Sequence, residues 1–202
     1  MLIQTCEIED CKWFDIAKSS EVSNYSTNST SISYDSTNQA YKIMKTGSDG
    51  LSSVTRNTLK FANNVKIEAD VMMSGSLTNI QVGLGLLNSS TSIGVDAKRY
   101  SGFSSSSYTM SIVESTRTDY GSNEVSESLT ASELQLNTWY HIILEIDGTD
   151  ITYTYKQGDT VINTLTTSSS VLDSSNNEFA MWVGFRNNNS AGYFKNIKIK
   201  PL

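Results

Sequence analysis

The sequence predicts an all-β fold, a two-sheet antiparallel jelly-roll β-sandwich, from three observations. Apolar and polar residues alternate in one segment after another, and this period of two is typical of strands with one buried face. Turn-forming residues separate the segments, and Asp147-Gly148 is the strongest hairpin signal among them. Helical periodicity is confined to one short turn over 130–134, with Thr130 as its cap and Glu133 closing a capping box. Many strands joined by short turns favour a sandwich or a barrel.

The individual strands follow from the side on which their apolar residues fall. Most positions follow the pattern of apolar residues on one face and polar residues or glycines on the other. The clearest strands, in chain order, are 65–71, 80–86, 140–146, 151–155, 181–186 and 194–199. Gly158-Asp159 marks a second turn after Asp147-Gly148. The polar stretches 19–33, 46–53, 101–107 and 168–177 are expected to be loops.

Length and composition predict one domain. One sandwich can reach the 202 residues of this chain, and none of the polar stretches is long enough for a linker. Residues 1–39 are expected to form an N-terminal strand and polar loops, and residues 40–200 the core. The chain holds 10 Tyr, 6 Phe and 3 Trp, an aromatic content that disordered chains lack.

The charge of the chain excludes several partners. The net charge is -6, whereas a nucleic-acid partner or an anionic membrane surface calls for a basic face. Membrane insertion is not expected, because no apolar run approaches the roughly 20 residues of a spanning segment. Residues 1–13 lack the cationic and apolar regions of a signal peptide. A mature form or a protein exported by other means, for example in a virus particle, is expected.

The two cysteines, Cys6 and Cys11, leave two interpretations open. They are either reduced thiols near the terminus or the ends of a small-loop disulfide. A zinc site is not expected, because zinc needs two further ligands and no paired motif follows.

Two segments carry a resemblance to a known superfamily. Residues 137–148, NTWYHIILEIDG, resemble the "W-[HY]-x-hydrophobic-x-hydrophobic-x-hydrophobic-D-G" strand and turn of the concanavalin A-like lectin/glucanase superfamily, which includes laminin-G-like domains and carbohydrate-binding modules. Residues 192–199, GYFKNIKI, are similar to its closing "F-D-N-I-x-V" strand. The strand with Gly83 and Gly85 fits the same order, so the resemblance spans roughly residues 40–200. It implies a concanavalin A-like fold and does not specify a function.

One position departs from the superfamily pattern. Many members have an Asp where Lys195 stands, and that Asp often helps to hold a structural calcium ion. A lysine removes the ligand and adds a positive charge, so calcium at that place becomes doubtful. Calcium at other acidic turns, such as Asp49 or Asp147 with Asp150, stays open, because convergence of ligands is not visible in sequence. No other cofactor is expected.

Catalytic motifs are incomplete, so a non-enzyme is expected. Glu145 and Asp147 are similar to the acidic motif of family 16 glucanases, but Thr149 stands where the second Glu belongs. His141 is the only histidine, and no G-x-S-x-G nucleophile motif accompanies it. His141 is therefore expected to have a structural or surface role.

A sugar-facing surface is the best candidate site. Trp182 and Arg186 alternate with core residues and should point away from the core. Sugars stack their C–H face on aromatic rings and hydrogen-bond to polar side chains. Glycines in a neighbouring strand would leave room for such a ligand. The alternative is that Trp182 is covered by a loop or by a partner chain. The predicted glycan face consists of Trp182, Arg186, Gln81, Gly83, Gly85, Tyr100 and Asp96.

The leading functional expectation is a non-catalytic carbohydrate-binding or adhesion module. It would bind a cell-surface glycan from an extracellular or virion surface, such as a phage tail fibre or tail tip. One alternative is a structural virion or surface module that contacts itself or other virion proteins without sugar. The other is an atypical glycan-active enzyme that uses Glu145 or Asp147. These preferences rest partly on fold analogy.

Overall fold

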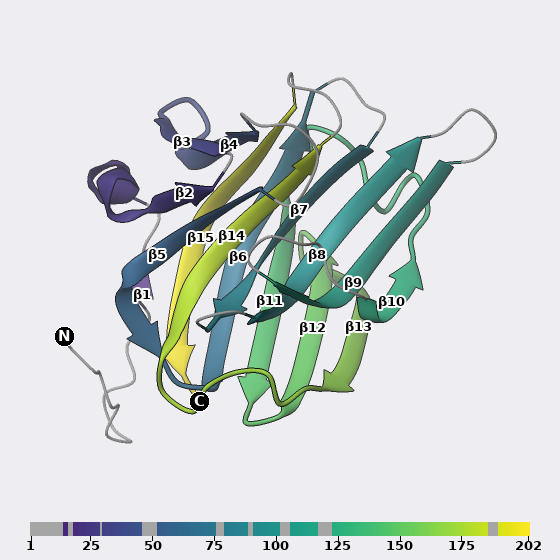
Figure 1. The fold of residues 1–202 in the computed structure, drawn as a ribbon. Coiled ribbons are helices and arrows are strands. Elements are labelled where there is room, and N and C mark those ends of the chain that lie inside the picture. Colours follow the sequence, from purple (N-terminus) through teal and green to yellow (C-terminus); the bar gives the residue numbers. More distant parts are fainter. Residues whose placement is uncertain are drawn as a thin grey trace.

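The computed structural model describes residues 14–15, 18–28, 30–45, 52–75, 79–88, 91–101, 106–116, 123–185 and 190–202. These residues form two antiparallel sheets packed face to face (Figure 1). The predicted all-β two-sheet antiparallel sandwich is therefore confirmed. Within the described part, the only helix is the short 3-10 helix η1 (Ser19–Asn24). No helix in that part is long and apolar enough to cross a membrane.

The first sheet has eight strands, in the order β13-β12-β11-β6-β15-β4-β3 with β1 paired to β15. Its strands are β1 (Phe14–Asp15), β3 (Thr30–Asp35), β4 (Ala40–Lys45), β6 (Asn64–Ser74), β11 (Tyr140–Asp147), β12 (Asp150–Gln157), β13 (Thr160–Ser168) and β15 (Ala191–Pro201). Segments far apart in sequence are neighbours here, since β6 lies between β11 and the closing strand β15.

The second sheet has seven strands, in the order β10-β9-β8-β7-β14-β5-β2. Its strands are β2 (Ser26–Asn28), β5 (Ser52–Phe61), β7 (Asn79–Leu87), β8 (Thr91–Ser101), β9 (Ser106–Thr116), β10 (Asn123–Ser128) and β14 (Asn177–Phe185). In Figure 1 this sheet lies in front of the first one. Below, the face of each sheet that is turned away from the other sheet is called its outer face.

The strands predicted from alternation are confirmed, and most are longer than the pattern showed. The stretch 19–33 was expected to be a loop, and this is wrong. It contains η1, β2 and the start of β3. Strand β3 forms because it pairs with β4, and its Ile32 packs against the core. Tertiary pairing thus outweighs the turn-forming composition of this stretch.

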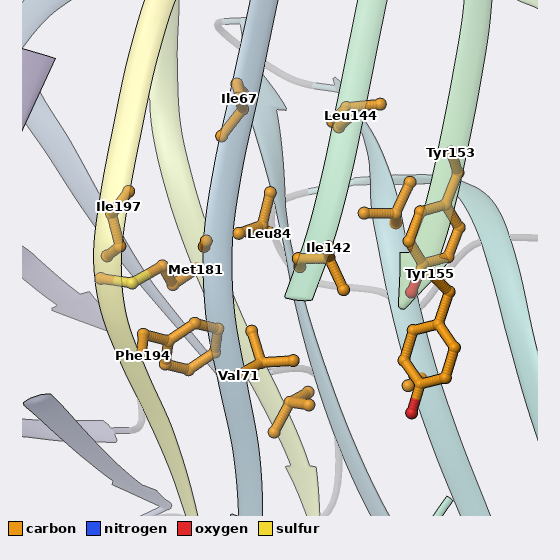
Figure 2. Close-up of a cluster of buried hydrophobic side chains, with 14 of the residues drawn as sticks. Ile67, Val71, Leu84, Ile142, Leu144, Tyr153, Tyr155, Met181, Phe194 and Ile197 are labelled. Atoms are coloured by element: carbon orange, nitrogen blue, oxygen red, sulfur yellow. The ribbon is translucent and has the colours of Figure 1, made fainter. Parts of the chain in front are cut away.

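The core fills the space between the inner faces. Figure 2 shows side chains from both sheets that meet there, and all of them are buried. Two tyrosines add aromatic contacts, since the rings of Tyr140 and Tyr155 stack with centroids 5.0 Å apart. The labelled core residues are Ile67, Val71, Leu84, Ile142, Leu144, Tyr153, Tyr155, Met181, Phe194 and Ile197. Strand parity predicted the inward positions on the strands other than β15, because successive side chains alternate between faces. Phe194 and Ile197, three residues apart, both point inward because β15 changes register between Lys195 and Lys198.

The predicted turns are also present. Gly148 joins β11 to β12 with a φ of 64°, a backbone angle that favours glycine. Gly158 joins β12 to β13 in the same way, with a φ of 59°. The segment 130–134 is a turn rather than a helix, but its predicted cap is there: the Thr130 N–H donates to Glu133 Oε2 over 2.7 Å. That hydrogen bond holds the pKa of the Glu133 carboxyl below its usual range.

Candidate functional site

The outer face of the second sheet carries the predicted glycan face. Trp182 on β14 lies directly opposite Gly83 on β7 and points away from the core, as its parity indicated. It packs instead with Leu87 and Ala180, which share the outer face. Asp96 on β8 lies opposite Gly83, so its backbone position belongs to the same face.

The Trp182 ring is nevertheless buried, with 3% of the residue exposed. A Cβ added to Gly83 would lie 2.1 Å from the indole Nε1 of Trp182. A Cβ added to Gly94 would lie 2.1 Å from the Cη2 at the other end of the ring. The indole therefore lies across the two glycines, which make room for it and not for a ligand. The expectation that Trp182 is an open stacking ring is wrong.

The remaining members of the predicted face divide into two groups. Gln81 is buried, and a Cβ on Gly85 would meet the carbonyl oxygen of Ile93 in the neighbouring strand at 2.2 Å. Neither leaves open room above the sheet. The side chains of Asp96 and Tyr100 and the whole of Arg186 lie outside the described residues. The part that these three play stays a prediction.

The outer face of the first sheet presents a different arrangement. A row of charged side chains crosses four adjacent strands, with each member directly opposite the next. From β12 to β15 the row reads Lys156, His141, Asp70 and Lys195. Directly opposite residues in antiparallel strands lie about 4.5–5.5 Å apart at their Cβ atoms, so these groups interact.

The centre of the row is a histidine–carboxylate pair. His141 Nδ1 lies 2.8 Å from Asp70 Oδ1, and Asn196 Nδ2 donates to Asp70 Oδ2 over 2.6 Å. Burial of Asp70 raises the pKa of its carboxyl, but the hydrogen bonds from His141 and Asn196 outweigh burial and hold the pKa below its usual range. An ionised carboxylate only accepts hydrogen bonds, so His141 Nδ1 carries the proton.

The sequence placed Asn196 in the closing strand without a special role. It adopts a φ of 51° at an irregularity between Lys195 and Lys198, where β15 changes register against β6. Bulges of this kind turn a side chain toward a neighbour. Here the bulge brings the Asn196 amide to Asp70, where it donates a hydrogen bond to the second carboxylate oxygen.

The carboxylates that resembled a glucanase motif have other partners. Lys66 Nζ lies 2.8 Å from Glu145 Oε1 and 3.4 Å from Glu68 Oε1. The hydrogen bond to Glu145 raises the pKa of the Lys66 ammonium. Asp147 accepts a hydrogen bond from Asn64 over 3.0 Å. Both acids thus tie neighbouring strands together.

An aromatic side chain adjoins the charged row. The Lys195 Nζ lies 3.9 Å from the centroid of the Trp139 ring, within the range of a cation–π contact. Trp139 is only partly buried, and it packs against an outer-face cluster that includes Met72 and Tyr193. Unlike Trp182, this indole lies over full side chains rather than glycines.

These groups surround a hollow of about 470 Å³ on the outer face of the first sheet. Asp159, from the turn between β12 and β13, closes one side. Below, this site is called the Trp139 hollow, and its lining is Asp70, Trp139, Tyr140, His141, Lys156, Gly158, Asp159 and Lys195. It combines an apolar ring with hydrogen-bond donors and acceptors, which is the composition expected of a small-ligand site.

Sequence reasoning did not identify this hollow. Trp139 was taken as part of a fold motif and Lys195 as a lost calcium ligand. The available signal was parity, since Trp139 and His141 are two residues apart on the polar face of one strand segment. Their convergence with Asp70 and Lys195 depends on the order β12-β11-β6-β15, which the sequence did not reveal.

No cluster of metal ligands is present among the described residues. Those residues contain no group of three or more His, Cys, Asp or Glu side chains placed to hold a metal ion. Lys195, where the superfamily has its Asp, contacts Trp139 instead. Cys6 and Cys11 lie outside the described residues.

Comparison with solved structures identifies the fold. The chain is similar to peanut lectin bound to a nonamer peptide, with a TM-score of 0.69, 8% identity and coverage of 96% of this chain and 98% of that one. It is also similar to the Ca²⁺/Man3GlcNAc-bound exoplasmic/lumenal domain of VIP36, with a TM-score of 0.63, 9% identity and coverage of 89% and 86%. A third structure is the CBM2 module of the evolved Dit protein of Lactobacillus casei BL23 phage J-1, with a TM-score of 0.56, 10% identity and coverage of 84% and 78%.

The concanavalin A-like jelly roll that the sequence motifs implied is thus shown. At identities of 8–10%, the likeness to these structures shows the fold alone and does not show a function. No family model matches the sequence, and no curated protein matches it either.

Proposed function

We propose that this chain is a non-catalytic carbohydrate-binding or adhesion module that holds a glycan in the Trp139 hollow. The observation that carries this proposal is a partly exposed indole beside a row of hydrogen-bonding side chains, in a hollow of about 470 Å³. A hollow of this size accommodates a ligand of a few sugar units at most.

The chemistry of the lining suits a sugar. The C–H face of a pyranose ring gains from contact with an indole, because the ring offers a large apolar surface with a negative face. Lys156 supplies donors to sugar oxygens, and Asp159 accepts from sugar hydroxyls. His141, held in one orientation by Asp70, adds a fixed polar edge.

The structural neighbours support this class of ligand. They include plant lectins, one of them from Bauhinia forficata in complex with GalNAc, and a carbohydrate-binding module of a phage. A glycan partner on a cell surface and a setting on an extracellular or virion surface are part of the proposal. The phage module favours the virion setting.

Two contacts favour binding over catalysis. The Nε2 of His141 lies 4.0 Å from a Glu68 carboxylate oxygen, whereas a Ser-His-Asp triad needs a hydroxyl there. Glu145 is held by Lys66 and is not presented as an acid or a nucleophile. Hydrolysis at these groups would require both pairs to be broken.

The test is binding to a glycan array, followed by titration calorimetry with the best ligand. Trp139→Ala should weaken binding by about five- to thirtyfold, since stacking of this kind is worth about 1–2 kcal/mol. Ile143→Ala is the matched control, because Ile143 lies on the same outer face of β11 but does not line the hollow. The proposal fails if folded Trp139→Ala binds as tightly as the control.

The outer face of the second sheet provides the competing location. Arg186, Asp96 and Tyr100 were predicted to contact the glycan there, and Arg186→Ala tests that placement. Loss of binding in Arg186→Ala together with full binding in Trp139→Ala would move the site to the second sheet while keeping the carbohydrate function.

A further inference from the structure

The charged side chains of the Trp139 hollow indicate which class of sugar it binds. This inference rests on the proposed function. The row across the sheet holds Lys156 and Lys195 but only one acid, Asp70. The row is thus positive in a chain whose net charge is -6. At physiological ionic strength charges farther away than about 8 Å are largely screened, so a bound ligand experiences the lining of the hollow, the row together with Asp159, rather than the whole chain.

Asp70 does little to reduce the positive charge that a ligand meets at the two lysines. Each of its oxygens already accepts a hydrogen bond, one from His141 and one from Asn196. Its side chain is 22% exposed, so most of the carboxylate is withdrawn behind those partners. Asp70 therefore acts as an internal anchor of the row.

Lys156 is the cation left for a ligand. It lies opposite His141 on one side and Val161 on the other, so neither cross-strand neighbour is an acid. Among the described residues, its ammonium forms no ion pair, whereas Lys66 and Lys60 each pair with a glutamate. Lys195 differs because its ammonium is held over the Trp139 ring.

Asp159 adds an acceptor to the hollow three residues after Lys156, on the turn that joins β12 to β13. It is an exposed residue of the β12–β13 turn, and its carboxylate can only accept hydrogen bonds when ionised. A ligand that spans the hollow meets a positive row at one side, an indole beside it and an acceptor at the turn. The matching molecule carries a negative group with hydroxyl donors close to it.

We infer that the Trp139 hollow selects acidic sugars, pyranosides that bear a carboxylate. The carboxylate pairs with Lys156 in the row, the ring lies against Trp139, and hydroxyls donate to Asp159. A neutral sugar of the same shape binds more weakly because it leaves the Lys156 ammonium without an anionic partner.

The experiment compares ligands that differ only in charge. Trigalacturonate and 3′-sialyllactose are each titrated calorimetrically against their own methyl esters, with the full chain at low and at physiological salt. The acid of at least one pair should bind about tenfold more tightly, as expected for a charge-assisted hydrogen bond. The preference should shrink as salt rises.

Variants then locate the preference. Lys156→Ala should remove the preference for the acid, weakening the acid more than the neutral partner, and Lys156→Arg should retain the preference. Lys198→Ala is the matched control, because Lys198 is an exposed lysine on the same strand and face as Lys195, outside the hollow. The inference is supported only if Lys156→Ala and Lys198→Ala differ.

Failure of this inference is separable from failure of the proposed function. Equal, Trp139-dependent binding of acid and neutral ligands overturns the inference and keeps the module a glycan binder. An acid preference that persists in Lys156→Ala also overturns it. If no glycan of any charge binds, the proposed function itself fails.

Discussion

The two outer faces of the sandwich each carry a tryptophan, and the two rings have opposite surroundings. Trp182, on the second sheet, lies over Gly83 and Gly94 and is 3% exposed. Trp139, on the first sheet, stays partly exposed beside a lysine and above larger side chains. One ring is therefore part of the packing, and the other borders a hollow.

This difference shows that the burial of an outward-facing tryptophan depends on the residues around its ring. Parity shows the face on which a ring lies but not its depth. Glycines opposite the ring, as at Gly83, create a recess that the ring itself fills. Charged neighbours on the adjacent strands, as around Trp139, keep the ring near solvent because those charges must stay hydrated.

Removing each ring in turn gives the strongest test of this comparison. Trp182→Ala should lower the free energy of unfolding by about 3–5 kcal/mol, the usual cost of deleting a large buried ring. Trp139→Ala should cost clearly less, because its ring is already partly hydrated. Urea denaturation of both variants measures the difference, and equal losses would contradict the assignment of the two rings to different roles.

The recess under Trp182 can be tested separately. Gly83→Ala should lower the free energy of unfolding by about 1–3 kcal/mol, the range for overpacking. Its Cβ would meet the Trp182 ring at 2.1 Å and the backbone oxygen of Val95 at 2.6 Å.

Gly184→Ala is the control on the same face. Its Cβ would meet only the flexible end of Gln81, at 2.9 Å from Oε1, so that side chain can move aside. The loss should therefore be smaller than for Gly83→Ala. A Gly83→Ala protein as stable as Gly184→Ala would show that the indole does not fill the recess.

The charged row predicts a dependence of stability on pH. The pKa of Asp70 is lower in the folded chain than in the unfolded one. Its stabilisation is therefore complete above the unfolded value of about 3.9 and disappears as the pH falls through the folded value. Asp70→Asn should be less stable than the wild type at neutral pH by about 1 kcal/mol, the worth of a hydrogen bond.

The gap between the wild type and Asp70→Asn should close as the medium is acidified below about pH 4. Urea midpoints at a series of pH values provide the measurement, with Asp159→Asn as the control because Asp159 is exposed on a turn. A constant gap down to the lowest pH at which the chain folds would show that the Asp70 pair does not stabilise this face.

The sequence predicted the sandwich well because its inner faces repeat one rule. The positions of Ile142, Leu144 and Met181 follow from alternation alone, and the structure buries all three. The site was harder, since it depends on which strands become neighbours. The convergence of Asp70, within β6, with Lys195, in the closing strand β15, is a consequence of topology that no local pattern encodes.

The smallest effect concerns the contact between Lys195 and Trp139. Cation–π contacts at exposed sites contribute about 0.5–1 kcal/mol, so Lys195→Met should lower the free energy of unfolding by that amount and Lys195→Arg should not. A double-mutant cycle with Trp139→Leu isolates the contact, because the loss from Lys195→Met should vanish when the ring is absent. If the loss persists without the ring, Lys195 stabilises the sheet through Asp70 instead, and the row rather than the indole sets the position of its ammonium.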